Sequence, residues 1–181
     1  MGICMGVRCS FPGGSLTIKE GQMARFKKVL VANRGEIAMR VFRACHDLCL
    51  QTVVIYSNED TYAAFRTAAD ESYLIGENES PLGAYLDIPR IIELARMHDC
   101  DAIHPGYGFL SENGDFARAC EQAGIKFIGP KSTILDMMGD KLSAKQMAID
   151  CNVPTTPGTK EPLKDREEAQ KLGMAFGFPA I

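Results

Sequence analysis

Short apolar runs alternate with stretches of helical periodicity, and this alternation constrains the fold more than any other feature of the sequence. The first two runs, 29–32 and 52–56, have the length and composition of strands buried inside a parallel sheet. Between them, apolar residues recur at helical spacing from Ile37 to Leu48. A strand, a helix and a strand within about thirty residues predict a βαβ unit with a right-handed crossover.

The same alternation continues along the chain. Three further strands are predicted at 72–75, 101–104 and 126–128. Two further helices are predicted at 88–95 and 116–123. Pro89 is acceptable in the first turn of its helix, and Gly124 is well placed to end the other. We therefore expect an α/β domain over 24–130, a Rossmann-like open parallel sheet with helices on both faces.

The character of the sequence changes after residue 130. Two short helices are expected at 131–138 and 141–150. A connector with two prolines follows at 154–158, and a charged, solvent-facing helix at 160–171. Residues 178–181 read as the opening of an apolar strand, which predicts an unfinished second domain over 131–181.

Residues 1–22 contain Gly, Ser and Cys without periodicity, and their apolar stretch is too short for a secretory signal. Lys19 and Glu20 can be encoded by a bacterial ribosome-binding sequence a few codons before Met23. We therefore expect Met23 to be the true start, residues 1–22 to be a disordered translated leader, and the protein to be cytoplasmic and bacterial.

Composition excludes several classes of protein. A formal net charge of -3 gives no reason to expect a nucleic acid or an anionic membrane as partner. No apolar run approaches the roughly 18 residues of a transmembrane helix. The seven cysteines form no regular framework. Cys45 and Cys49 are four residues apart, a spacing that places both on one face of a helix. They are either metal ligands or free thiols, and we favour free thiols. Free thiols indicate a reducing, intracellular compartment.

The loop 33–36 follows the first strand, where ligands bind in open α/β sheets. The three-glycine dinucleotide fingerprint is absent, which argues against an NAD-dependent dehydrogenase. The alternative to a dinucleotide site in this loop is a structural turn, in which Arg34, Glu36 and Arg40 face solvent or a neighbouring subunit.

The segment 104–113, HPGYGFLSEN, is a second candidate. Its glycines and proline allow a sharp turn close to a ligand and present Tyr107 from that turn. His104 is either a general base or, as we favour, an interior histidine, and Ser111 or Asn113 can cap the next helix.

A third candidate is Asp140 followed by Lys141. Asp140 can cap a helix that Lys141 opens. Lys141 is either a free surface charge or a point charge that reaches a nucleotide phosphate.

Four motifs in register resemble the biotin carboxylase component of biotin-dependent carboxylases: VLVANRGEIAMRVFRAC from Val29, AIHPGYGFLSEN from Ala102, FIGP from Phe127 and MGDKLSAK from Met138. Their order and spacing match that family from Phe26 to the last residue. Stretches beginning at Phe26, Tyr56, Tyr85 and Leu135 are most similar to pyruvate carboxylases, although acetyl-CoA and propionyl-CoA carboxylase subunits share the core motifs.

The resemblance implies a pre-ATP-grasp domain followed by the start of an ATP-grasp fold. Such proteins use ATP, Mg²⁺ and bicarbonate to form carboxyphosphate and then carboxylate biotin on a carrier; a pyruvate carboxylase passes the carboxyl group to pyruvate to give oxaloacetate. It also implies a homo-oligomer working with biotin carrier and carboxyltransferase domains or subunits.

The family's site residues carry over by position. Lys141 matches an ATP-binding lysine, and Tyr107 with Gly108 matches the wall of the bicarbonate and biotin pocket. The helix face used in dimer contacts is matched by Arg34, Glu36, Arg40 and Arg43.

Four features of the family match nothing in this sequence: the second ATP-binding lysine, the glycine-rich loop, the Mg²⁺-binding glutamates and the catalytic arginine region. We therefore expect no catalytic or metal-binding residue here, and no activity from this chain alone. Alternatives are a stand-alone, non-catalytic module that binds a carboxylase subunit, or a carbamoyl-phosphate or purine-pathway ATP-grasp ligase, which the segment 104–113 argues against.

Overall fold

The computed structural model of the chain describes residues 9–11, 14–16, 26–77, 79–156 and 164–177. Five strands form one sheet in which every neighbouring pair is parallel, in the order β5-β4-β3-β6-β7. They are β3 (Lys28–Val31), β4 (Gln51–Tyr56), β5 (Glu71–Leu74), β6 (Ala102–His104) and β7 (Lys126–Phe127). All five strands predicted from the sequence are confirmed within one or two residues.

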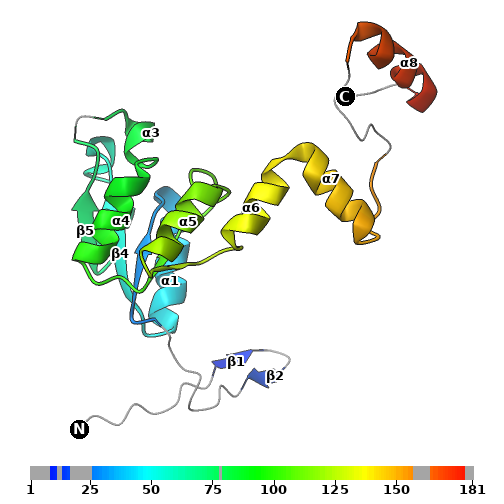
Figure 1. Ribbon diagram of the computed structural model, residues 1–181. Helices are drawn as coiled ribbons and strands as arrows, with labels where there is room; N and C mark the ends of the chain where they lie inside the picture. Colours follow the sequence, from blue (N-terminus) through cyan, green and yellow to red (C-terminus); the bar gives the residue numbers. More distant parts are fainter. Residues whose placement is uncertain (1–8, 12–13, 17–25, 78, 157–163, 178–181) are drawn as a thin grey trace.

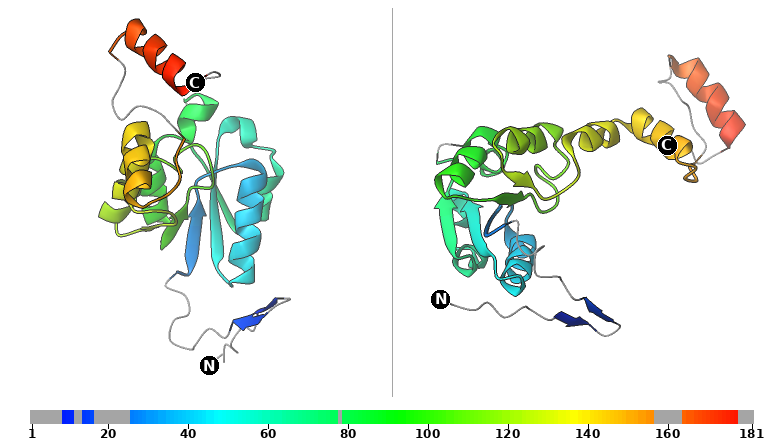
Figure 2. Two further views of the ribbon diagram at one scale, coloured as in Figure 1. Left: turned by 90° about the vertical axis from the view of Figure 1, so that its right-hand side faces the viewer. Right: turned by 60° about the horizontal axis from the view of Figure 1, so that its bottom comes forward.

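Helices cover both faces of this sheet (Figures 1 and 2). On one face lie α1 (Gly35–Asp47) and α2 (Ala64–Ala68), and on the other lie α3 (Pro81–Ala84), α4 (Ile88–Met97) and α5 (Gly114–Gln122). The predicted Rossmann-like α/β architecture is thus confirmed.

Strand β3 shows why the buried strands read as continuous apolar runs. Val29 and Val31 pack into the cluster beneath α1, whereas Leu30 between them packs into the cluster beneath α4 and α5. All three are fully buried. A strand covered on both faces has no solvent side, so polar residues do not alternate with apolar ones.

Side-chain caps begin the helices where the sequence placed them. The carboxamide of Asn113 accepts a hydrogen bond from the Phe116 amide at 2.9 Å, and the carboxylate of Asp140 accepts one from the Ser143 amide at 2.7 Å. Each satisfies an amide that the first helical turn leaves unpaired. After α5, Gly124 has φ 71° and ends the helix in the left-handed region.

Beyond the sheet, the predicted short helices are present as α6 (Ser132–Gly139) and α7 (Lys141–Asp150), leading away from the sheet in Figure 1. Arg118 of α5 pairs with Asp136 of α6 at 2.6 Å, on the exposed side of the contact between the two helices. The predicted boundary at residue 130 falls between β7 and α6 and stays a prediction.

Of the charged helix predicted at 160–171, residues 160–163 lie outside the described residues, and the described part forms α8 (Arg166–Phe176). The Asp165 carboxylate accepts a hydrogen bond from the Glu168 amide at 2.8 Å, and this cap sets the start. Of the predicted connector, 154–156 is non-helical and 157–158 lies outside the described residues. The predicted strand at 178–181 also lies outside them.

Among the helices of the described residues, three short ones were not predicted: α2, α3 and a 3₁₀ helix, η1 (Asn58–Asp60). At three to five residues each, they are too short to show a helical period. The shared helix face predicted for Cys45 and Cys49 is wrong. Cys45 is buried, whereas Cys49 is exposed beyond the end of α1 with φ 57°.

The leader predicted at 1–22 lies mostly outside the described residues. Within it, β1 (Cys9–Phe11) and β2 (Gly14–Leu16) pair as an antiparallel hairpin. Among the described helices, none combines the length and apolar character needed to cross a bilayer.

Candidate functional site

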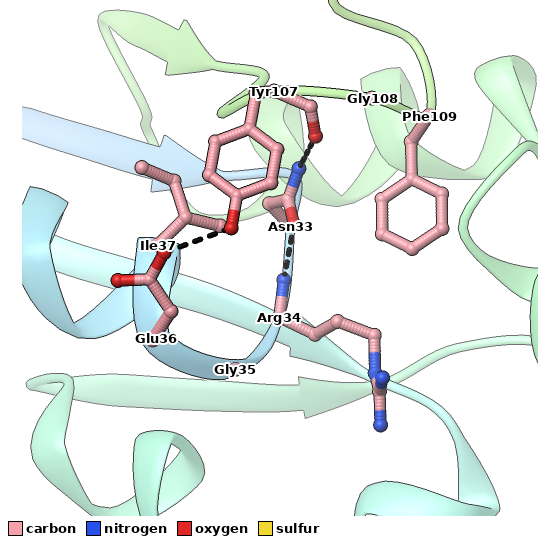
Figure 3. A pocket seen from close by; sticks show the side chains of 8 residues that line it. All are labelled: Asn33, Arg34, Gly35, Glu36, Ile37, Tyr107, Gly108 and Phe109. Carbon is pink, nitrogen blue, oxygen red and sulfur yellow. Dashed lines mark hydrogen bonds between the residues drawn. The ribbon is translucent and has the colours of Figure 1, made fainter.

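The candidate site lies where β3 and β6 end side by side. Because these neighbouring strands are parallel, the turn after β3 and the loop after β6 meet at the carboxyl edge of the sheet. Residues 33–37 and 107–109 line a pocket of about 370 Å³ there (Figure 3). The two loop candidates found in the sequence therefore form one site.

Asn33 joins the two halves of this pocket. Its Nδ2 donates to the carbonyl oxygens of Pro105 at 2.8 Å and Tyr107 at 2.9 Å, and its Oδ1 accepts from the Arg34 amide at 2.8 Å. Asn33 is only 3% exposed. Gly106 passes so close that an added Cβ would lie 2.5 Å from Nδ2 of Asn33.

Tyr107 and Gly108 form the outer wall of the pocket. The Tyr107 side chain is exposed, and its hydroxyl donates to Oε1 of Glu36 at 2.8 Å (Figure 3). This hydrogen bond raises the pKa of Tyr107 above its ordinary value. Gly108 has φ 64° and nothing within 4 Å of the position of a Cβ, so a ligand can approach its backbone.

His104 lies at the end of β6 and serves the turn. Its Nδ1 accepts a hydrogen bond from the Gly106 amide at 2.9 Å. Burial lowers the pKa of His104, which favours the neutral ring that this contact requires. These contacts support the interpretation as an interior histidine.

A second hollow of about 250 Å³ adjoins the first and shares Arg34 and Phe109 with it. The Arg34 guanidinium binds the buried Asp60 carboxylate at two points, with Nε to Oδ2 at 2.7 Å. The Tyr85 hydroxyl donates to the same Oδ2 at 2.7 Å. Together, these two donors hold the pKa of Asp60 below its usual range.

The sequence interpretation missed Asp60 and Tyr85. Asp60 follows β4 at the carboxyl edge of the sheet, and this position was the signal that could have singled it out. Nothing in the local sequence marks Tyr85, which is 1% exposed and lies after a four-residue helix.

The residues predicted for a dimer face divide into two groups. Arg34 and Glu36 are bound within the chain, to Asp60 and Tyr107, whereas Arg40 and Arg43 are exposed on α1. A dimer role for these four residues stays a prediction.

Lys141 is exposed as the first residue of α7. It is not among the lining residues of either hollow, so this structure does not unite it with Tyr107 and Gly108. Among the described residues, no three His, Cys, Asp or Glu side chains are grouped to hold a metal ion.

The sheet, the paired loops and the sequence together define a class of protein. Residues 25–135 match the family described as "Biotin carboxylase, N-terminal domain", and the chain belongs to that family. The resemblance found in the sequence is thus confirmed.

Within this class, pyruvate carboxylases are similar over most of the chain. Mouse mitochondrial pyruvate carboxylase is 50% identical over 179 residues, covering 98% of this chain and 15% of the relative. The Bacillus subtilis enzyme is 54% identical over 155 residues, covering 86% and 14%. The chain therefore spans about 15% of the length of such relatives.

Solved structures agree with this relationship. The biotin carboxylase domain dimer of Hydrogenobacter thermophilus 2-oxoglutarate carboxylase, in complex with MgADP, ADP and bicarbonate, is 52% identical with a TM-score of 0.80. The match covers 85% of this chain and 34% of that one. Rhizobium etli pyruvate carboxylase is 46% identical with a TM-score of 0.70, covering 73% and 13%.

Proposed function

We propose that the chain forms the N-terminal region of the biotin carboxylase part of a pyruvate carboxylase. The complete enzyme carboxylates carrier-bound biotin with ATP and bicarbonate, and then carboxylates pyruvate to oxaloacetate. The observation that carries this proposal is the pocket walled by Tyr107 and Gly108, built on a family-matched sheet.

The pocket wall suits small, flat ligands such as bicarbonate or the ureido ring of biotin. Tyr107 is 60% exposed, and a hydrogen bond to Glu36 holds its hydroxyl, so the ring offers a flat surface at little entropic cost. The backbone at Gly108 is open to close approach. We assign these two residues to binding and orientation, not to bond making.

We assign Lys141 to ATP. Its exposed ammonium group at the start of α7 can offset phosphate charge. One charge-assisted contact contributes only about 1–3 kcal/mol, too little to hold a nucleotide usefully. The remaining ATP contacts and the Mg²⁺ ligands are therefore assigned to the rest of an ATP-grasp domain.

The surface of α6 and α7 supports a larger neighbouring structure. Apolar side chains stand exposed along these helices: Ile134, Met137, Met138 and Ile149. Helix α7 contains no buried residue. A helix without a buried face gains little stability from packing, which favours the proposal that further protein covers it.

The direct test compares two proteins. We expect the 181-residue chain to show no ADP formation that depends on both bicarbonate and free biotin. The complete product of the reading frame is expected to show it. Activity of the short chain would refute its proposed inactivity, and an inactive complete product would refute the carboxylase function. A reading frame that stops at Ile181 would favour the stand-alone module that binds a carboxylase subunit.

We propose homo-oligomerisation through the exposed face of α1, with biotin carrier and carboxyltransferase domains or subunits as further partners. Arg40 and Arg43 are both exposed there. Their reversal to Glu is expected to raise the dissociation constant of the oligomer, measured by light scattering over a dilution series. Unchanged dissociation would exclude this face.

Pyruvate as the final acceptor has one specific competitor. The 2-oxoglutarate carboxylase domain is 52% identical to this chain, and the biotin carboxylase subunit of a pyruvate carboxylase is 49% identical. Sequence similarity in this region therefore does not separate the two acceptors. Assays of the complete enzyme with pyruvate, 2-oxoglutarate, acetyl-CoA and propionyl-CoA decide among them.

We propose the cytoplasm of a bacterium as the location. The mouse relative is named a mitochondrial enzyme, which makes the mitochondrion the alternative. Cell fractionation of the source organism distinguishes the two.

A further inference from the structure

The loop 105–109, here the Tyr107 loop, is bound by two side chains from the segment that follows β3. Asn33 binds it from beneath and Glu36 binds it from the side (Figure 3). Asn33 belongs to the turn between β3 and α1, and Glu36 belongs to the first turn of α1. Both lie more than seventy residues from Tyr107 in sequence. The segment 33–36 therefore helps to set the position of the pocket wall.

The hydrogen bonds of Asn33 require a carboxamide. The two N–H groups on Nδ2 of Asn33 donate to the carbonyl oxygens of Pro105 and Tyr107, and Oδ1 accepts from the Arg34 amide. Aspartate has the same shape but, when ionised, only acceptors, so it would face two carbonyl oxygens without a donor. The position thus demands the chemistry of Asn and not merely its size.

The close approach of the loop depends on the same contact. Gly106 has φ 69°, and any side chain there would collide with the carboxamide of Asn33. This packing leaves the loop no space to shift toward the sheet. The backbone of Tyr107 is therefore fixed from below by contact and by hydrogen bonding.

Glu36 fixes the other end of Tyr107. Its Oε1 accepts a hydrogen bond from the Tyr107 hydroxyl at 2.8 Å, so the ring is tied at its tip while its backbone is tied by Asn33. A side chain held at both ends keeps one orientation, and a pocket wall of this kind needs no rearrangement when a ligand binds.

We propose that Asn33 and Glu36 are positioning residues that hold Tyr107 and Gly108 in place for bicarbonate and biotin. Asn33 acts on the backbone of the Tyr107 loop, and Glu36 acts on the ring. Neither residue is assigned a contact with the reacting atoms. The inference rests on the proposed carboxylase function, because that function makes the wall a binding surface.

The first experiment measures the complete carboxylase carrying Asn33→Asp, with free biotin as acceptor. Because misplacement of a binding wall by about 1 Å can cost up to 10²-fold, we expect kcat/KM for biotin to fall roughly 10- to 100-fold. The KM for ATP is expected to stay unchanged. Glu93→Gln, on the exposed surface of α4, is the control and should match the wild type.

Acidity provides a rescue that general damage to the fold would not show. Burial beside carbonyl oxygens should raise the pKa of the introduced aspartate, and its protonated form regains one donor. The ratio of variant to wild-type kcat/KM for biotin should therefore rise as pH falls from about 8 to about 6. A ratio that is constant or falls would contradict the proposal.

Glu36 is tested through Tyr107. Glu36→Gln keeps an acceptor oxygen and should stay near wild type, whereas Glu36→Ala should raise the KM for biotin about as much as Tyr107→Phe. The double variant Glu36→Ala, Tyr107→Phe should be no worse than either single variant, because both remove the same hydrogen bond. Additive effects would exclude action through Tyr107.

Hydrogen exchange separates failure of this proposal from failure of the proposed function. In Asn33→Asp, the amides of residues 106–111 should exchange faster while those of α4 stay unchanged. Unchanged exchange at 106–111 overturns the positioning role whether or not the wild type carboxylates biotin. An inactive wild-type enzyme overturns the proposed function, and faster exchange with an unchanged KM for biotin overturns only the link to binding.

Discussion

Nε of Arg34 donates to Oδ2 of Asp60 across 2.7 Å, which ties the turn after β3 to the 3₁₀ helix after β4. Asp60 is 4% exposed, so its carboxylate depends on this partner and on the Tyr85 hydroxyl. The same arginine lines both hollows at the carboxyl edge of the sheet. The ion pair therefore contributes to the shape of the site as well as to stability.

Replacing Asp60 by Ala should destabilise the fold. The change leaves the Arg34 guanidinium and the Tyr85 hydroxyl without their acceptor, and we expect a loss of about 2–3 kcal/mol in the free energy of unfolding by urea. The neighbouring exposed Glu59→Ala is the control, expected to change stability by less than about 0.5 kcal/mol. Equal effects of the two substitutions would mean that the pair is energetically neutral.

Acid should remove the contribution of Asp60. Its pKa in the folded protein lies below the ordinary 3.8, chiefly because Arg34 donates to it. A carboxyl group with a lowered folded pKa stabilises the protein above its unfolded pKa and loses that contribution as pH falls through the folded value. The stability difference between wild type and Asp60→Asn should thus be constant above about pH 5 and shrink below pH 3.8. A difference that grows in acid would contradict this assignment.

Gly106 should tolerate alanine less well than Gly35 does. Both have positive φ, which costs alanine about 1–2 kcal/mol. Only at Gly106 does the added Cβ meet a neighbour, at 2.5 Å from Nδ2 of Asn33, whereas at Gly35 nothing lies within 4 Å. We expect Gly106→Ala to be the more destabilising by about 1–3 kcal/mol in chemical denaturation. An equal loss of unfolding free energy in Gly106→Ala and Gly35→Ala would show that Asn33 moves aside freely.

Phe116 is expected to be a main contributor to the core. Its ring is fully buried and meets Phe127 edge-on, with centroids 5.8 Å apart. Truncation to Ala should lower the free energy of unfolding by about 3–5 kcal/mol. Met97→Ala, at a residue that is 62% exposed, should change it by less than about 0.5 kcal/mol. Similar midpoints of urea denaturation for the two variants would contradict the larger role expected for Phe116.

The described cysteines should differ sharply in reactivity. Cys49 and Cys151 are exposed, whereas burial raises the pKa of Cys45, and that of Cys100 and Cys120 to about 12. Because the thiolate is the nucleophile, brief alkylation should label the exposed pair at least roughly 100-fold faster. Peptide mass spectrometry resolves each site, and the contrast should disappear in urea. Early labelling of Cys100 or Cys120 would contradict the described burial.

Much of the fold was predictable because its signals are local. Apolar runs predicted the strands, and capping residues such as Asn113 and Asp140 predicted where helices begin. The helices missed, η1, α2 and α3, are too short to carry a periodic pattern. Their positions depend on contacts with the rest of the sheet.

The candidate site was predictable only in part. Its two loops, including Tyr107 and Gly108, stood out by composition, and their order in the sheet brought them together. Arg34 and Glu36 were expected to face solvent or a second subunit. Both are exposed in the folded chain, and the structure adds their partners within the chain, Asp60 and Tyr107, 26 and 71 residues away.

The sequence by itself determined the class of fold and the family, because strand length, helical period, caps and motif order are written locally along the chain. Only the tertiary structure decided the partners of Asn33, Arg34 and Glu36. A polar side chain has no periodic signal, and its partner depends on which parallel strands lie side by side. That order is set by the packing of the whole sheet.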